Sequence, residues 1–242
     1  MEIITSLDNK RIKRYSKLLQ KKYREEESLF LVEGEHLVEE AYKSGKLLCV
    51  IKTEDVDVNY DVETIYVSRD VIKKLSSTMS PQNIIGVVKY LDKKEIGNKV
   101  IILDGLQDPG NLGTIIRSSV AFNFDTVILS DNCVDVYNDK VIRSSEGMIF
   151  NTNIIRGNIL EIINDLKNKD YKIYGTSVVN GISSSEVNGN DKLAFIIGNE
   201  GNGISDEVFK LCDKNIYVPM NSKCESLNAS ICASIIMYEL NK

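Results

Sequence analysis

The 242-residue sequence has no long hydrophobic run, only three prolines, one histidine and no tryptophan. Its 15 glycines and 43% apolar residues exclude a collagen-like, proline-rich or disordered chain. The longest apolar runs, such as residues 100–103 and 235–237, fall far short of the ~18 residues that span a bilayer. No apolar segment resembling a secretory signal follows the first residues. We therefore expect a cytoplasmic protein without membrane contact.

The cysteines and the histidine give no sign of a metal site. Five cysteines, an odd number without a C-x-x-C pair, argue against a disulfide framework or a zinc ribbon. The single histidine, His36, cannot supply a three-histidine site, and we expect it to be a half-buried helix residue. No bound metal is therefore expected.

The net charge of −5 hides an asymmetry. Residues 1–24 contain eight Lys or Arg and two Asp or Glu, a local charge of +6, whereas the other 218 residues carry −11. This concentration of positive charge predicts an RNA-phosphate contact by Lys10, Arg11, Lys13 and Arg14. A charge run is more often a solvated helix face, so that alternative stays open.

The first 95 residues predict a small α/β domain. Asp8 is a candidate cap for a first helix, in which Ile12, Tyr15, Leu19 and Tyr23 recur every three or four residues. A second helix is predicted over residues 33–43 and a third over 70–76, with strands over 47–52, 64–67 and 84–90. The charged stretch 91–99 reads as a linker.

Residues 98–242 predict a second α/β domain. The pattern predicts strands over 100–104, 126–129, 172–177, 193–198 and 215–218, and helices over 112–122, 138–145, 159–168, 205–211 and 227–240. Strands that alternate with helices indicate a mostly parallel sheet covered on both faces. Ligands of such sheets bind beyond the carboxyl ends of the strands.

Three loops at that edge carry unusual residues. In D-G-L-Q-D-P-G-N-L-G-T-I-I-R, Asn111 is a candidate helix cap and Arg117 lies further along the helix. In F-I-I-G-N-E-G-N-G-I-S, the glycine order differs from that of dinucleotide-binding proteins, and Glu200 is a candidate functional carboxylate. In V-P-M-N-S-K-C-E-S-L-N-A-S, Ser226 is a candidate cap of the last helix. Taken singly, Ser226 and Asn228 would more often be structural residues.

Together, these segments resemble the three motifs of the SpoU (TrmH-like) family of RNA ribose 2′-O-methyltransferases, within the SPOUT superfamily. The resemblance rests on N-L-G-T-I-I-R-S-S, I-I-G-N-E-G-N-G-I and V-P-M-N-S-K-C-E-S-L-N-A-S and covers residues 98–242. The stretches L-D-N-K-R-I-K-R-Y-S-K-L and K-Y-R-E-E-E-S-L-F-L-V-E-G-E-H-L-V-E-E-A are similar to the family's substrate-binding domain.

The resemblance implies a Rossmann-like domain with a C-terminal trefoil knot, an N-terminal domain similar to ribosomal protein L30e, and S-adenosylmethionine as cofactor without a metal. It also implies a homodimer through the C-terminal domain. The implied substrate is RNA, with ribosomal RNA favoured and transfer RNA as the alternative. The implied catalytic residues are Asn111, Arg117, Glu200, Ser226 and Asn228, and the implied cofactor contacts are Thr176, Gly198, Val218 and Leu227.

The identity of the group that removes the 2′-hydroxyl proton stays open. The family's usual proposal is the arginine of the first motif, but a guanidinium hardly loses its proton in a protein. We therefore expect Arg117 to orient a phosphate, while the proton leaves through substrate phosphate, water or Glu200. The alternative to an enzyme is a non-catalytic RNA-binding protein of the same fold. Loss of the polar motif residues would indicate that alternative, and none is lost here.

Overall fold

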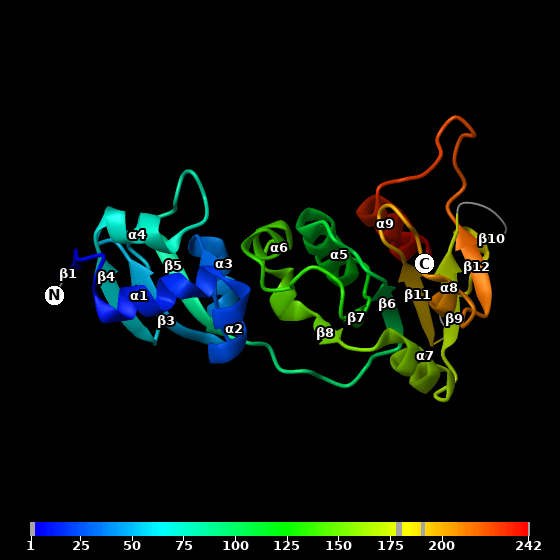
Figure 1. Ribbon diagram of the computed structural model, residues 1–242, viewed down its shortest axis with the longest axis horizontal. Helices are drawn as coiled ribbons and strands as arrows, with labels where there is room; N and C mark the ends of the chain where they lie inside the picture. The colour runs from blue at the N-terminus through cyan, green and yellow to red at the C-terminus, as the bar shows by residue number, and fades with distance from the viewer. Residues whose placement is uncertain (1–2, 178–180, 190–191, 242) are drawn as a thin grey trace. The chain divides into compact units, whose positions relative to one another are not determined.

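The computed structural model describes residues 3–177, 181–189 and 192–241 (Figure 1). The chain forms two compact units. The first contains residues 1–92 and 135–151, and the second contains residues 93–134 and 152–242. The change from one unit to the other near residue 92 lies in the segment that the sequence indicated as a linker. Among the described residues, no helix has the length and apolarity to cross a membrane.

The first unit is built on a mixed five-stranded sheet. Its strands, in spatial order, are β1 (Ile3–Ile4), β4 (Glu63–Val67), β3 (Leu47–Lys52), β5 (Ile84–Lys89) and β2 (Leu29–Glu33). β5 runs antiparallel to β3 and β2, whereas β1, β4 and β3 are parallel. The helices are α1 (Lys10–Ser16), α2 (Lys21–Glu27), α3 (Glu35–Lys43) and α4 (Arg69–Leu75). The short β1 and the strand β2 are absent from the sequence prediction.

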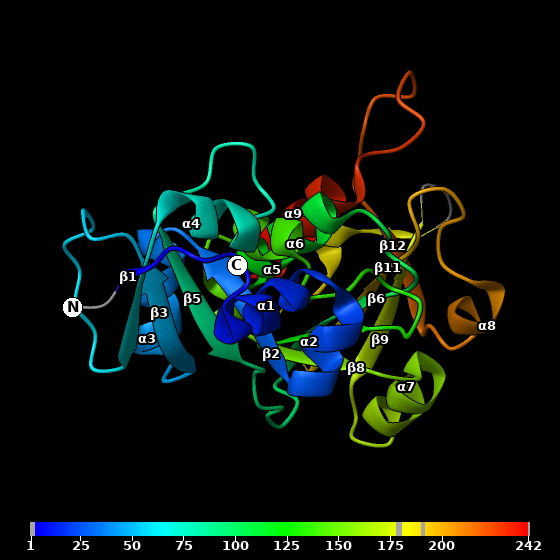
Figure 2. The ribbon, with the colours of Figure 1, turned by 60° about the vertical axis from the view of Figure 1, so that its left-hand side comes forward.

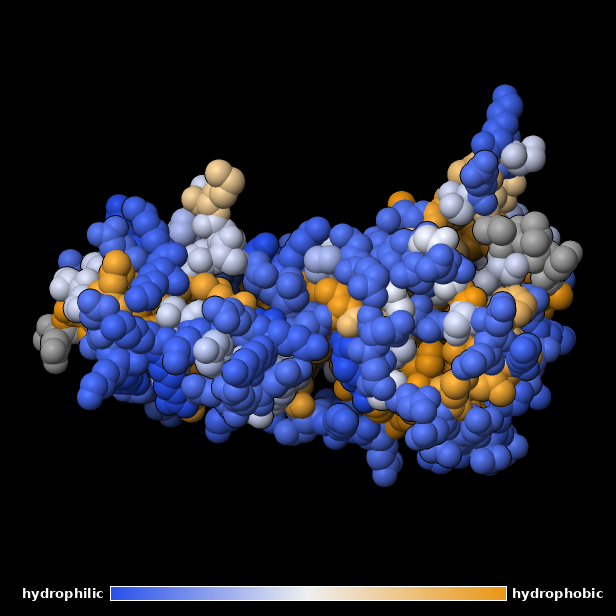
Figure 3. Space-filling view, in the orientation of Figure 1, coloured by the Kyte–Doolittle hydropathy of each residue, from blue (hydrophilic) through white to orange (hydrophobic). Residues whose placement is uncertain are grey.

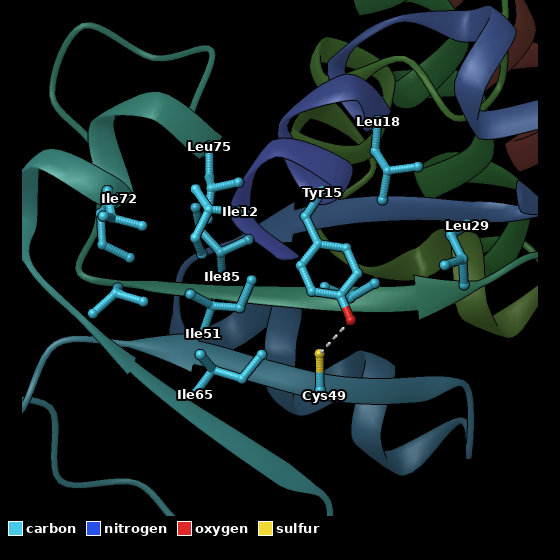
Figure 4. Close-up of a cluster of buried hydrophobic side chains, with 13 residues drawn as sticks. Ile12, Tyr15, Leu18, Leu29, Cys49, Ile51, Ile65, Ile72, Leu75 and Ile85 are labelled. Carbon is cyan, nitrogen blue, oxygen red and sulfur yellow. Dashed lines mark hydrogen bonds between the residues drawn. The ribbon is translucent and has the colours of Figure 1, made fainter. Parts of the chain in front are cut away.

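One core of the first unit lies between α1, α4 and the sheet (Figure 4). Ile12 and Tyr15 of α1 point toward Cys49, Ile51 and other apolar strand residues. The Cys49 thiol donates to the Tyr15 hydroxyl at 3.8 Å. Burial and this neighbouring thiol raise the pKa of Tyr15. The predicted apolar face of the first helix is therefore confirmed at Ile12 and Tyr15.

The predicted first helix is wrong in three details. Asn9, not Asp8, caps it, because the Asn9 side chain accepts from the Arg11 backbone N–H while the Asp8 carboxylate pairs with Lys13. The helix does not continue to Tyr23, since the backbone of Gln20 is extended and separates α1 and a short 3₁₀ turn from α2. That turn buries Leu18 and leaves Leu19 exposed.

Residues 135–151 pack on the first unit although the sequence places them within the C-terminal domain. They include α6 (Asp139–Ser144). The Tyr137 ring lies 4.7 Å from that of Phe30, and the Arg24 guanidinium donates to the Asp135 carboxylate at 2.6 Å. His36 of α3 is exposed rather than half-buried, and its ring lies 3.2 Å from the Glu146 carbonyl.

The second unit contains a parallel seven-stranded sheet, which confirms the predicted sheet type (Figure 2). Its strands, in spatial order, are β10 (Ile182–Ser183), β12 (Lys214–Tyr217), β9 (Lys172–Thr176), β11 (Leu193–Ile197), β6 (Lys99–Leu103), β7 (Thr126–Leu129) and β8 (Asn153–Arg156). The helices are α5 (Pro109–Ala121), α7 (Ile159–Lys167), α8 (Asp206–Phe209) and α9 (Ala229–Glu239). β8 and β10 are absent from the sequence prediction.

The central strands of this sheet are buried on both faces, as expected for a parallel sheet between helices. Val100 and Ile102 of β6 share a core with Ile159 and Ile163 of α7. Because successive strand residues point to opposite faces, Ile101 belongs to the other face, and it is also fully buried. α5 packs against α9, where the Ser118 and Ser234 hydroxyls lie 2.8 Å apart.

Candidate functional site

Three loops follow the carboxyl ends of β6, β11 and β12 in the second unit. β6 and β11 are adjacent, with Leu103 opposite Ile197, so the segments after them leave the sheet side by side. The loop between β12 and α9 extends outward, with residues 219–226 exposed (Figure 1). Figure 3 shows hydrophilic surface on the outer part of this loop. These are the three motif-bearing loops of the sequence.

Residues 198–205, here called the glycine loop, form a tight turn after β11. The Asn199 and Gly203 backbones pair through two hydrogen bonds of 2.9 Å. A Cβ atom at Gly198 would lie 2.1 Å from the Gly203 carbonyl carbon, so only glycine fits there. Gly203 has a φ of +71°, which glycine adopts without strain.

A cavity of about 650 Å³ lies between the glycine loop and the start of α9. Its size is in the range of pockets for small molecules and cofactors. All four predicted cofactor residues line it, namely Thr176, Gly198, Val218 and Leu227, together with the predicted catalytic residues Glu200, Ser226 and Asn228.

The other two predicted catalytic residues, Asn111 and Arg117, do not line this cavity. Of the two, Asn111 is hydrogen-bonded to a described residue that does, whereas Arg117 is not. Asn111 is 8% exposed, and its side-chain amide donates to the Glu200 carboxylate at 3.1 Å. Arg117 is exposed on α5. Among the described residues, no hydrogen bond or ion pair joins Arg117 to Asn111, Glu200 or Asn228. The structure therefore brings Asn111 to the site of its own chain and leaves Arg117 outside it.

A chain of hydrogen bonds joins the three loops. The Asn228 side-chain amide donates to the Asn111 side-chain oxygen at 2.9 Å, and Asn111 donates in turn to Glu200. The Glu200 carboxylate also accepts from the backbone N–H groups of Gln107 at 3.1 Å and Asp108 at 3.0 Å. Burial alone would raise the pKa of Glu200, but these donors stabilise the ionised carboxylate and lower its pKa.

Both predicted caps in these loops are wrong by a few residues. Asp108, not Asn111, caps α5, and its carboxylate accepts from the Asn111 backbone N–H at 2.8 Å. Asn228, not Ser226, caps α9 by accepting from the backbone of Ser230 and Ile231. The two predicted cap residues therefore have side chains that do not serve as caps, and Ser226 is exposed at the cavity.

Most of the predicted RNA contacts of the first unit are paired with carboxylates. Arg11 donates to Glu63 through two nitrogens at 2.8 and 2.6 Å. Lys13 lies 2.8 Å from Asp8, and Arg14 lies 2.6 Å from Glu27. Among the described residues, Lys10 and Lys17 have no carboxylate partner. Lys17 instead has its ammonium 5.1 Å from the centre of the Tyr23 ring.

Several residues that line the cavity went unpredicted, among them Asn199, Met220 and Cys232. Asn199 and Met220 are within two residues of the predicted Glu200 and Val218, so their position in the motif loops is the available signal. Cys232 lies one helical turn beyond Asn228 in α9, a spacing that places both on one side of a helix. Burial raises the pKa of the Cys232 thiol to about 11.

The comparisons with known proteins agree with this geometry. The profile of the SpoU rRNA Methylase family matches residues 98–238, and that of the MRM3-like substrate binding domain matches residues 9–86. The chain is 37% identical to the 23S rRNA (guanosine(2553)-2'-O)-methyltransferase RlmP of Bacillus subtilis, over 99% of both chains. Fold, cavity and matches define an RNA methyltransferase. The chain belongs to the SpoU rRNA methylase family.

Solved structures show the same fold over nearly the whole chain. The chain matches the AdoMet-bound rRNA methyltransferase of Sinorhizobium meliloti with a TM-score of 0.88 and 25% identity, covering 99% of this chain and 97% of that one. It matches an RNA 2'-O ribose methyltransferase with a TM-score of 0.84 and 27% identity, covering 99% and 98%.

Proposed function

We propose that this protein transfers a methyl group from S-adenosylmethionine to a ribose 2′-oxygen of ribosomal RNA, with a guanosine of 23S rRNA as the first candidate. The observation that carries the proposal is the hydrogen-bond chain Asn228–Asn111–Glu200, which joins the three motif loops beside one cavity. The substrate follows from the 23S rRNA activity named for the Bacillus subtilis relative.

The cavity fits the cofactor. It is large enough for a nucleoside with an amino-acid tail, and the missing side chain of Gly198 lets the backbone of the glycine loop close on itself at Gly203 and form one wall of the cavity. When bound, S-adenosylmethionine supplies a methyl group on a sulfonium leaving group. We assign the contacts with it to Thr176, Gly198, Val218 and Leu227, as expected from the resemblance. We expect no metal.

Glu200 is better suited to positioning than to proton removal. Its carboxylate accepts three hydrogen bonds, which lower its pKa and make it a weak base. It fixes the Asn111 amide, while Asn228 fixes the same amide from the other side. We assign Ser226 and these asparagines to orienting the ribose and assign proton removal to substrate phosphate or water.

A homodimer through the second unit completes the proposed site. Ile231 and Tyr238, two turns apart on α9, are 52% and 53% exposed, and a second copy of the chain would cover them. Arg117 on the adjacent α5 is exposed and lies outside the cavity of its own chain. In the dimer it would act on the substrate at the partner's cavity.

The finer fold assignments follow the resemblance. We propose that the second unit contains a C-terminal trefoil knot and that the first unit is similar to ribosomal protein L30e and binds RNA. We assign RNA binding to residues 1–95 and methyl transfer to residues 98–242, which are the domain boundaries that the resemblance implies. A cytoplasmic location is in keeping with a ribosomal RNA substrate.

Two measurements test the proposed function. Calorimetry of the full-length protein should show S-adenosylmethionine binding. Single-turnover methylation of 23S rRNA and of transfer RNA, followed by mapping of 2′-O-methyl marks, should show transfer to 23S rRNA. Binding of the cofactor without transfer to either RNA would instead support a non-catalytic RNA-binding protein, and a mark on transfer RNA would correct the substrate.

A further inference from the structure

Asp104, directly after β6, connects the end of this strand to the glycine loop through two hydrogen bonds. Its side-chain oxygen Oδ2 accepts from the Ser205 backbone N–H at 2.8 Å and from the Ser205 hydroxyl at 2.7 Å. Asp104 is only 8% exposed. A buried carboxylate is costly unless donors surround it, so the two Ser205 donors offset that cost.

A further hydrogen bond connects the other end of the same loop to Gly105. The Asn199 side-chain amide donates to the Gly105 carbonyl at 2.8 Å. The Asn199 side-chain oxygen accepts from the backbone N–H groups of Gly201 at 2.9 Å and Asn202 at 3.1 Å. Both ends of the glycine loop are therefore tied to residues 104–105.

The contact between Asp104 and Ser205 replaces an ordinary helix cap. Ser205 occupies the position before α8, but its side chain makes no capping hydrogen bond there. Its hydroxyl is directed to Asp104 instead. Neither Asp104 nor Ser205 lines the cavity, whereas residues 198–204, the rest of the glycine loop, all do.

We propose that Asp104 is a positioning residue, which holds the glycine loop in the shape that binds S-adenosylmethionine. It touches no cofactor itself and acts through Ser205. This inference rests on the proposed function, because the ligand of the loop is the proposed cofactor. Asp104 is not among the catalytic and cofactor residues that the resemblance implies.

The test compares the full-length protein with Asp104→Asn, Ser205→Ala and Ser205→Thr. Loss of the charged acceptor should weaken S-adenosylmethionine binding about tenfold in Asp104→Asn, and loss of one donor should weaken it about threefold in Ser205→Ala. Ser205→Thr keeps both donors and should restore the wild-type affinity. The double variant Asp104→Asn/Ser205→Ala should bind as Asp104→Asn does, because both changes remove one contact.

Asp213→Asn is the matched control. The Asp213 carboxylate lies in the same unit, outside the cavity, and accepts from the Ile173 backbone N–H at 2.9 Å and from the Lys167 ammonium at 2.7 Å. Both variants should lower the melting temperature, but only Asp104→Asn should raise the KM for S-adenosylmethionine, with kcat at saturation within about threefold. Unchanged cofactor affinity in Asp104→Asn, or an equal loss in Asp213→Asn, would overturn the inference alone. If the wild-type protein bound no cofactor, both this inference and the proposed function would be overturned.

Discussion

The side-chain amide of Asn228 donates to the side-chain oxygen of Asn111 at 2.9 Å, across 117 residues of sequence. Asn228 caps α9, and Asn111 lies in the first turn of α5. Since Asn111 also donates to Glu200, both ends of its amide group are engaged and its orientation is fixed. Asn228 therefore has two separable roles, as a helix cap and as the donor that orients Asn111.

Replacement of Asn228 by serine separates these roles. Serine can cap α9 but is too short to reach Asn111, so stability should stay close to that of the wild type while single-turnover methylation falls at least about tenfold. Alanine removes the cap as well and should cost about 1 kcal/mol more in the free energy of unfolding. Chemical denaturation and single-turnover assays measure the two effects. Equal methylation by the serine variant and the wild type would contradict the positioning role.

The pH dependence tests the role of Glu200. Because its folded-state pKa lies below the ordinary value of 4.5, its contribution to stability is present above pH 4.5 and is lost as the pH falls through the lowered pKa. Stability of the wild type should therefore fall more steeply in this acidic range than that of Glu200→Gln. Between pH 5.5 and 8, the methylation rate profiles of the two proteins should have the same shape. An acidic limb near neutral pH that is absent in Glu200→Gln would identify Glu200 as the base.

Local sequence patterns predicted much of the fold. The apolar runs at Leu47–Lys52 and Thr126–Leu129 are strands with the predicted bounds, because β-branched and aliphatic residues favour buried strands. The caps were less predictable, since D-P-G-N and S-L-N each offer two capping residues a few positions apart. Which of them caps depends on what the other side chain contacts. Asn111 faces Glu200 and Asn228, so Asp108 caps the helix.

Contacts between distant residues could not be predicted from local patterns. Phe30, Tyr90 and Tyr137 come together although no periodicity relates them, with Tyr90 and Tyr137 stacked at 4.0 Å. This cluster draws residues 135–151 to the first unit. Similarly, the sequence shows that Arg11 and Glu63 are charged but not that they meet. The alternation of strands and helices placed the three motif loops at one edge of the sheet, but it could not predict that Asn111, Glu200 and Asn228 would contact one another there.

The ion pairs of Arg11, Lys13 and Arg14 change which residues of the first helix we expect to contact RNA. Lys10 and Lys17 are two helical turns apart, and the structure pairs neither with a carboxylate of the described residues. Replacement of both by glutamine should weaken RNA binding and reduce the slope of log affinity against log salt by about 1 to 2. Titrations at several salt concentrations measure the slope.

Lys13→Gln/Arg14→Gln is the matched control for the same helix. These side chains are held by Asp8 and Glu27, so the slope should change less than in the lysine pair. Equal changes in both double variants would show that the ion pairs open when RNA binds. No change in either would leave the helix as a solvated surface.

The proposed dimer predicts a change of mass in solution. Ile231→Glu places a charge on the exposed face of α9, where burial against a second copy would be costly. Light scattering should give two chains for the wild type and a single chain of 27.2 kDa for the variant. Because Ile231 is 52% exposed in its own chain, the variant should keep its melting temperature within a few degrees. A wild type that is already monomeric would contradict the dimer.

Arg117 should act across the dimer, and mixing two inactive variants tests this. Arg117→Ala should bind cofactor but transfer no methyl group, since the residue is exposed and outside the cavity. Leu227→Trp, at a half-buried residue that lines the cavity, should fill the cavity and block cofactor binding while the fold is retained. A mixed dimer then has one complete site, made of the intact cavity of the Arg117→Ala chain and the arginine of its partner. After subunit exchange, equal amounts of the two variants should recover about a quarter of the wild-type rate per site. If the arginine acted within its own chain, no site in the mixture would be complete and no activity would return.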